Sequence, residues 1–266
     1  MSSTRWCLVA FGVFLQTQVL SPLYAADMIR IPAGTFTMGN NSGPDDERPA
    51  HVIDLPAFEI DFFPVTNAQF AQFLRALGPR NASGERRYDD DDNDARIHRL
   101  PGKDHDWQAD AGFEKHPVVE ASWLGARDYC AWLGKRLLTE AEWEKAARGS
   151  DARPYPWGAQ SPTPQHARFG AGYNQTASVD SFPQGRSPYG VWDMVGNTWE
   201  WVSSAYRPYP YRGDDGREDM EPGPVRGTRG GGHDASANEI TTTQRGRNLS
   251  RAPRAGHHNI GFRCAR

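Results

Sequence analysis

The segment around His233 holds residues that can transfer protons. His233 and Asp234 are adjacent, and Glu239 follows shortly after them. A histidine beside carboxylates can act as a general acid or base near neutral pH, where imidazole titrates. The same residues could instead be polar loop residues that satisfy backbone hydrogen bonds. We treat His233, Asp234 and Glu239 as candidate catalytic residues and keep the structural interpretation open.

Further basic groups lie near the C-terminus. His257 and His258 are adjacent, and neighbouring residues on a strand point to opposite faces, so we do not expect both to bind one metal ion. A cluster of arginines could contact an anionic substrate group, although a solvated or salt-bridged surface is the favoured interpretation. The cluster consists of Arg245, Arg247, Arg251 and Arg254.

A polar insertion at residues 78–117 contains an acidic run, Asp89 to Asp94, interrupted only by Asn93. Closely spaced oxygen ligands suit calcium, but the run lacks the glycine and the distal glutamate of an EF-hand loop. A solvated acidic loop is therefore the favoured interpretation.

Composition and charge restrict the class of protein. The 266 residues are 38% hydrophobic and 24% charged, as in a soluble globular protein. A net charge of −3 gives no basic footprint for nucleic acid, so we expect no nucleic-acid partner. There is neither an internal repeat nor a low-complexity linker, and we expect one domain at residues 27–266.

The first 26 residues read as a cleaved signal peptide. Arg5 precedes an apolar stretch from Trp6 to Leu15, which is too short to span a bilayer, and Ala25-Ala26 offers a cleavage site. A retained membrane anchor is the alternative. Cleavage predicts a periplasmic or secreted protein without a membrane span, in which Cys130 and Cys264 either form a disulfide or remain separate buried thiols.

The elements that must position the candidate residues are short. Alternating residues predict strands at 28–32 and 36–38, with a hairpin turn at Ala33-Gly34, and further strands at 52–55 and 58–62. Thr66, Ser122 and Thr139 can cap three helices, the last with a capping box to Glu142. No helix is predicted after Ser150.

Nine motifs, in order along the chain, resemble the formylglycine-generating, or sulfatase-modifying factor, family. They are Met28–Gly39, Glu47–Val52 with Pro64–Asn67, His116–Val119 with Ser122-Trp123, Gly134–Leu137, Thr139–Glu144, Tyr155–Gly158, Asp193–Trp201, Arg229–Gly231 and Gly261–Cys264. The resemblance implies an α/β (α+β), C-type-lectin-like single domain with little regular secondary structure.

The resemblance also assigns roles by position. It implies a disulfide between Cys130 and Cys264, and an active cleft at the His233 segment. Trp199 falls on a cleft-lining position, and we add Arg247 and His257 as candidate substrate-cleft residues. A structural calcium ion is implied, and its ligands would be Asp193, Gly196, Thr198 and Glu200.

The family's formylglycine generators hold copper with two cysteines, and soft thiolates suit Cu(I). Here those positions fall on Ala235 and Ile240. We therefore expect neither copper at this site nor formylglycine generation, and the sequence identifies no redox cofactor.

The resemblance extends to the family's exported pyoverdine-maturation branch. It implies an exported oxidoreductase or maturation enzyme whose partner is a peptide-like metabolite, such as a siderophore precursor, or a protein substrate. The alternative is a catalytically silent, lectin-like binding module.

Overall fold

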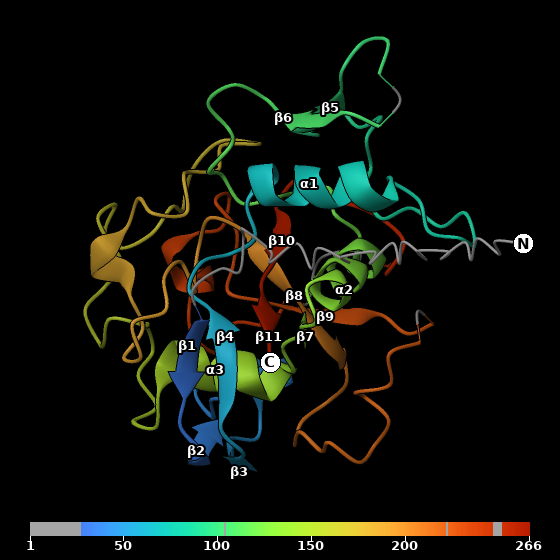
Figure 1. Cartoon of the computed structure of the whole chain (residues 1–266). Coiled ribbons are helices and arrows are strands. Elements are labelled where there is room, and N and C mark those ends of the chain that lie inside the picture. Colours follow the sequence, from blue (N-terminus) through green and yellow to red (C-terminus); the bar gives the residue numbers. More distant parts are fainter. Residues whose placement is uncertain (1–27, 104, 222, 247–251) are drawn as a thin grey trace, which may run out of the picture.

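The computed structural model describes residues 28–103, 105–221, 223–246 and 252–266. The predicted signal segment, Arg247 and Arg251 lie outside these residues. Within them, three α-helices and eleven short strands are joined by long irregular segments (Figure 1). This mixed α/β architecture with little regular secondary structure confirms the predicted fold class.

The helices are α1 (Asn67–Leu77), α2 (Trp123–Trp132) and α3 (Glu140–Arg148). The strands are β1 (Met28–Ile31), β2 (Gly34–Met38), β3 (His51–Leu55), β4 (Phe58–Asp61), β5 (Ile97–Arg99), β6 (Trp107–Ala109), β7 (Arg136–Leu137), β8 (Trp199–Ala205), β9 (Arg226–Arg229), β10 (Ile260–Phe262) and β11 (Cys264–Ala265). Three 3-10 turns are η1 (Asp45–Glu47), η2 (Pro183–Gly185) and η3 (Ala237–Glu239).

The predicted hairpin between the first two strands is wrong. β1 pairs antiparallel with β4, whereas β2 pairs with β3 in a separate two-stranded sheet. The connection between β1 and β2 is held from α3, because Lys145 Nζ donates to the carbonyls of Pro32 and Gly34 at 2.8 and 2.7 Å. These carbonyls therefore bind an ammonium group instead of closing a turn between the two strands.

All three predicted helix caps are confirmed. Thr66, Ser122 and Thr139 each accept a hydrogen bond from a backbone N–H in the first turn of their helix. Thr139 forms the predicted capping box with Glu142, and Thr66 forms another with Gln69. Each cap satisfies backbone donors that a helix leaves unpaired at its start, which contributes about 1 kcal/mol.

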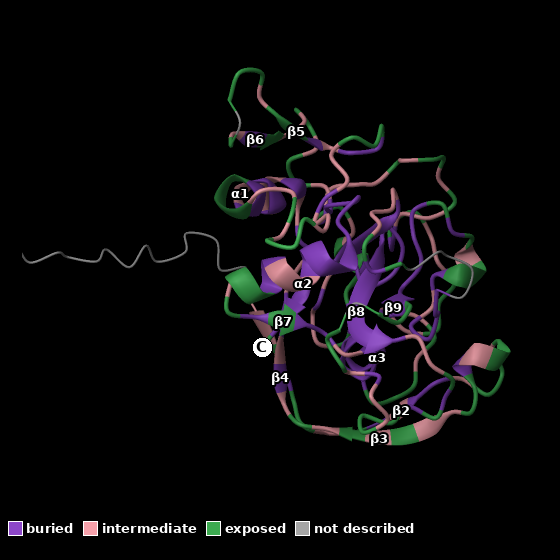
Figure 2. Cartoon of the chain, turned by 90° about the vertical axis from the view of Figure 1, so that its right-hand side faces the viewer, coloured by how far each residue is buried: buried purple, intermediate pink, exposed green. Residues whose placement is uncertain are grey.

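A three-stranded sheet in the order β10-β8-β9 forms the frame of the candidate site. β8 is buried along its whole length (Figure 2). β10 runs parallel to it, with Ile260 opposite Trp199, and β9 runs antiparallel, with Arg229 opposite Glu200. The residues before β10 and those after β9 are therefore brought together at the start of β8.

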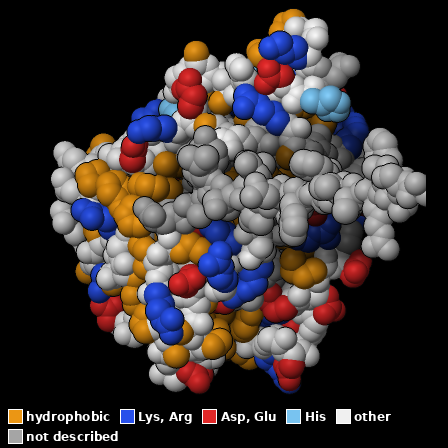
Figure 3. Space-filling view, viewed as in Figure 1, with side chains coloured by type: hydrophobic (Ala, Val, Ile, Leu, Met, Phe, Trp, Pro, Cys, Tyr) orange, Lys and Arg blue, Asp and Glu red, His pale blue; other side chains and the backbone are white. Residues whose placement is uncertain are grey.

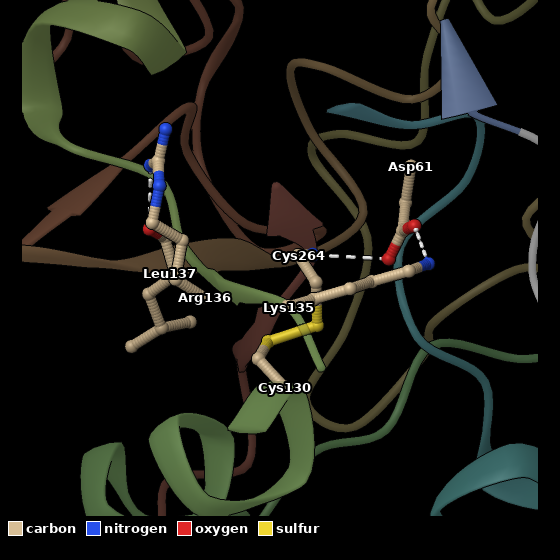
Figure 4. Close-up of a disulfide and its surroundings, with 6 residues drawn as sticks. All are labelled: Asp61, Cys130, Lys135, Arg136, Leu137 and Cys264. Atoms are coloured by element: carbon tan, nitrogen blue, oxygen red, sulfur yellow. Dashed lines mark hydrogen bonds and ion pairs between the residues drawn. A yellow bond between two sulfur atoms is a disulfide. The ribbon is translucent and has the colours of Figure 1, made fainter. Parts of the chain in front are cut away.

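Cys130 on α2 and Cys264 on β11 form a disulfide, with 5.6 Å between their Cα atoms (Figure 4). Beside it, Lys135 Nζ lies 2.5 Å from Asp61 Oδ1, and the Cys264 N–H donates to Asp61 Oδ2 at 3.1 Å. Burial raises the pKa of Asp61, and the ammonium of Lys135 opposes that rise. The bond joins α2 to the four-stranded sheet β1-β4-β11-β7.

Arg245 belongs to a buried ionic cluster rather than to an exposed basic surface. Its Nε donates to Glu140 Oε1 at 2.7 Å, and Arg229 Nη2 donates to Glu144 Oε2 at 2.5 Å, with all four side chains fully buried. Arg254 is exposed and pairs with Glu85 at 2.7 Å. These contacts favour the salt-bridged interpretation of the two arginines over an anion site.

The face viewed in Figure 3 carries Lys and Arg side chains interspersed with Asp and Glu side chains. Among the described residues, no helix has the length and apolar character needed to cross a bilayer.

We predict that the mature chain without its disulfide is less stable. Cys130 and Cys264 are 134 residues apart in the sequence. On the loop-entropy model, a bond across that separation stabilises the folded protein by about 4–5 kcal/mol, because it restricts the unfolded chain. The Cys130→Ser, Cys264→Ser double variant should lose stability of that order in urea unfolding. Thiol titration of the denatured, unreduced mature protein should find almost no free thiol, and two free thiols per chain would contradict the bond.

Candidate active site

Close packing of glycines brings the segment after β9 to the start of β8. Gly230 and Gly231 adopt positive φ angles of 97° and 80°. A Cβ atom on Gly231 would lie 2.4 Å from the carbonyl oxygen of Glu239, so only glycine fits there. The chain then returns to the turn before β8, where the His233 N–H donates to the carbonyl of Asn197 at 2.8 Å.

His233 is a buried imidazole with one free nitrogen. Its Nδ1 lies 2.9 Å from the Asn197 carbonyl, and a carbonyl only accepts, so Nδ1 carries the proton and Nε2 carries a lone pair. Nε2 is buried and has no hydrogen-bond partner among the described residues. Burial lowers the pKa of His233, which favours the neutral ring.

Asp234 and His258 form an accessible pair beside His233. His258 Nε2 lies 3.7 Å from Asp234 Oδ2, and the two side chains are 27% and 36% exposed, respectively. Asn259 Nδ2 donates to Asp234 Oδ2 at 3.1 Å. The His258 imidazole is the main group that lowers the pKa of Asp234, and this lower pKa keeps the carboxylate ionised. The His258 ring centre lies 6.2 Å from that of His233 and 4.3 Å from that of Tyr173.

The structure places the other predicted residues differently. Trp199 is buried beside Gly232, at the edge of this pair. Glu239 caps its own 3-10 turn, since its carboxylate accepts from Ser236 N and Oγ at 3.0 and 2.8 Å. His257 packs near Trp201, with ring centres 6.1 Å apart. Of the predicted set, His233, Asp234 and Trp199 are brought together, whereas Glu239 and His257 make other contacts.

His258, Asn259 and Tyr173 were not among the predicted site residues. The sequence held a signal for His258, because neighbours near a strand face opposite ways and only one of two adjacent histidines can reach Asp234. Nothing in the sequence indicated Tyr173, which comes from a loop distant from the other residues along the chain.

Ala235 and Ile240 are hydrophobic packing residues. Both are buried in the cluster that contains Trp143, Met194 and Val195. The chemistry available at this site therefore comes from imidazole and carboxylate groups, which bind and transfer protons, and not from thiolates at these two positions.

The residues assigned to calcium lie in and beside the turn before β8. Asp193 is buried, and its Oδ1 has no hydrogen-bond partner among the described residues, while Oδ2 accepts from Asn197 Nδ2 at 2.7 Å. Burial raises the pKa of Asp193 to about 7. Such an oxygen fits a cation. Glu200 fits less simply, because both its oxygens already accept from Arg263, at 2.6 to 3.0 Å.

The fold and the site together define a lectin-like α/β domain in which two histidines and an aspartate gather at the start of the buried strand β8. A family model described as the sulfatase-modifying factor enzyme 1-like domain matches residues 17–266, and the chain belongs to this family.

Three similar proteins illustrate the range of relatives. The serine/threonine-protein kinase pkn1 of Chlamydia caviae is 37% identical over 92% of this chain, but the matched part is only 38% of that protein's length. The inactive C-alpha-formylglycine-generating enzyme 2 of Bos taurus is 34% identical, covering 90% of this chain and 87% of its own. The structure of PvdO from Pseudomonas aeruginosa superposes with a TM-score of 0.69 at 30% identity, covering 91% of this chain and 94% of that one.

We predict that His233 makes folding stability depend on pH. Its pKa in the folded protein lies below the ordinary value, so the unfolded chain binds the proton more tightly. The contribution of His233 to folding stability is present above about pH 6.5 and is lost as the pH falls below that value. Asp234, His258 and Arg168 face the ring and modulate the effect.

The melting temperature should therefore fall more steeply between about pH 7.5 and 5.5 in the wild type than in His233→Gln. Equal slopes in the wild type and His233→Gln would contradict the assignment.

We also predict calcium binding at Asp193. Calcium takes six to eight oxygens and accepts mixed carboxylate and carbonyl ligands, here Asp193 with Gly196, Thr198 and Glu200. Calcium at a hundred times its dissociation constant should stabilise the metal-stripped chain by about 2.7 kcal/mol. Asp193→Ala should bind one calcium fewer per chain by elemental analysis, whereas Asp214→Ala, at an exposed site, should not. An unchanged calcium content in Asp193→Ala would remove this site.

Proposed function

We propose that the chain is an exported oxidoreductase or maturation enzyme that acts on a peptide-like metabolite, such as a pyoverdine-type siderophore precursor, in the periplasm. The observation that carries this proposal is the solvent-accessible Asp234–His258 pair, which adjoins the buried base His233 and the Trp199 ring. The family membership and the likeness to PvdO support the substrate class. The apolar stretch at residues 6–15 supports export.

The described residues are assigned proton transfer. Ionised Asp234 lies 3.7 Å from His258 Nε2 and orients the imidazole, so that His258 can accept a proton from an acidic N–H or O–H of the substrate. Asn259, which directly follows His258, donates to Asp234 and holds its carboxylate in place. Burial lowers the pKa of His233 and favours the neutral ring, whose Nε2 lone pair has no partner among the described residues. Glu239 takes no part in this assignment, since its carboxylate is engaged in the cap.

A catalytically silent binding module is the second candidate. The packing of Ala235 and Ile240 in the core favours it, because the positions of the family's copper thiolates have become structural. In that case Trp199 and Tyr173 would contribute aromatic surface to a ligand, and the histidines would serve only recognition.

The test uses a strain that lacks the gene and is complemented with variants, with exported metabolites compared by mass spectrometry. Asp234→Asn and His258→Gln should each slow maturation by about a hundredfold or more, since general acid–base groups contribute on that scale. His98→Gln is a matched control, because His98 pairs with Asp110 at 3.4 Å on another part of the surface. Full maturation by both site variants would contradict the proposed enzyme and favour the binding module.

The purified protein, with copper added, should yield no aldehyde from a cysteine peptide that carries the sulfatase motif. Detection of the formylglycine product would contradict the assignment of Ala235 and Ile240.

A further inference from the structure

The acidic run of the polar insertion is less exposed than its composition suggests. Asp94 is only 8% exposed, and Asp92 lies beside it on the surface. Both carboxylates meet Glu120, which comes from a different segment, so that one oxygen of each of the three groups lies within 4.8 Å of the others. Three acidic side chains thus converge on one point.

Glu120 is the decisive member of this trio. The residue is 3% exposed, and the described groups that act on its carboxylate are other carboxylates, with neither a hydrogen-bond donor nor a cation among them. Its backbone is fixed on both sides, because the N–H donates to the carbonyl of His257 and the C=O accepts from the N–H of Asp89, at 3.1 and 3.0 Å. Glu120 therefore places a buried carboxylate in the trio, and none of the described residues donates to it.

The described residues around this carboxylate leave room for it and include no cation that pairs with it. A Cβ atom on Gly256 would lie 2.6 Å from Glu120 Oε2, so the neighbouring chain approaches without a side chain. Arg86, which precedes the acidic run, pairs with Asp89 and Asp91. Burial and the other carboxylates raise the pKa of Glu120 to about 8, as expected for an uncompensated acid.

We propose that Asp92, Asp94 and Glu120 bind a hard divalent cation, with calcium as the best match. Calcium binds oxygen ligands at about 2.3–2.6 Å, so two ligands on one ion can lie up to about 5 Å apart, as the trio requires. All three donors are carboxylate oxygens, which suit calcium, magnesium and manganese rather than soft metals. The site is separate from the one assigned to Asp193.

The cation would connect the insertion to the candidate active site. Asp94 also accepts hydrogen bonds from the Tyr173 hydroxyl and from Asn174 Nδ2, the latter at 3.0 Å. Tyr173 is 66% exposed, and its ring packs against His258. A cation on Asp94 would therefore hold Tyr173 over His258 and order this side of the candidate site. The metal site itself does not depend on the proposed reaction.

The test is calorimetric titration of the full, metal-stripped mature chain with calcium chloride and, separately, manganese chloride. Glu120→Gln and Asp92→Asn should each weaken one site by about tenfold or more, because each removes one of three ligand charges. Asp91→Asn is the matched control, since this exposed residue of the same run pairs with Arg86 and stands outside the trio. Asp92 is itself exposed, so its variant answers the question even if Glu120→Gln fails to fold.

A spectroscopic arm identifies the site. Terbium bound at Asp94 should luminesce on excitation of Tyr173, and Tyr173→Phe should lose this signal while still binding calcium. Unchanged binding of both cations by Glu120→Gln and Asp92→Asn, or no binding by the wild type, would overturn the proposal.

Discussion

The buried ion pair between Arg263 and Glu200 is the constraint on which the centre of the molecule depends. Arg263 donates to both oxygens of Glu200 and to the carbonyl of Asp193, and Trp143 Nε1 donates to Glu200 Oε2 at 2.9 Å. Breaking such a pair leaves an uncompensated buried charge, which costs about 3–5 kcal/mol. Because Glu200 directly follows Trp199 on β8, the pair fixes the strand start around which the candidate site forms.

Local features of the fold could be predicted because their causes are local. Thr66, Ser122 and Thr139 cap helices through bonds to residues of the first turn, and this spacing is visible in the sequence. The disulfide followed from the resemblance. The predicted β1–β2 hairpin was wrong because tertiary packing determines which strands pair. β1 pairs with β4, and Lys145, which is distant in the sequence, donates to the carbonyls between β1 and β2.

The candidate site was predicted only in part, because some of its residues are neighbours in the sequence and others are brought together by tertiary packing. His233 and Asp234 were recognisable as one short segment, but their neighbours come from two other segments. His258 and Asn259 arrive because β10 runs parallel to β8, and Tyr173 arrives because Asp94 holds its hydroxyl. A sequence shows which groups can carry protons, whereas the pairing of strands decides which of them meet.

The position of β11 has a consequence for how the chain is made. β11 pairs with both β4 and β7, although its residues are translated long after theirs. At about 5–20 residues per second, a ribosome reaches Cys264 roughly 6–25 s after completing β7. Throughout that interval the sheet remains open and the thiol of Cys130 has no partner. The four-stranded sheet therefore cannot be completed until this last segment has been made.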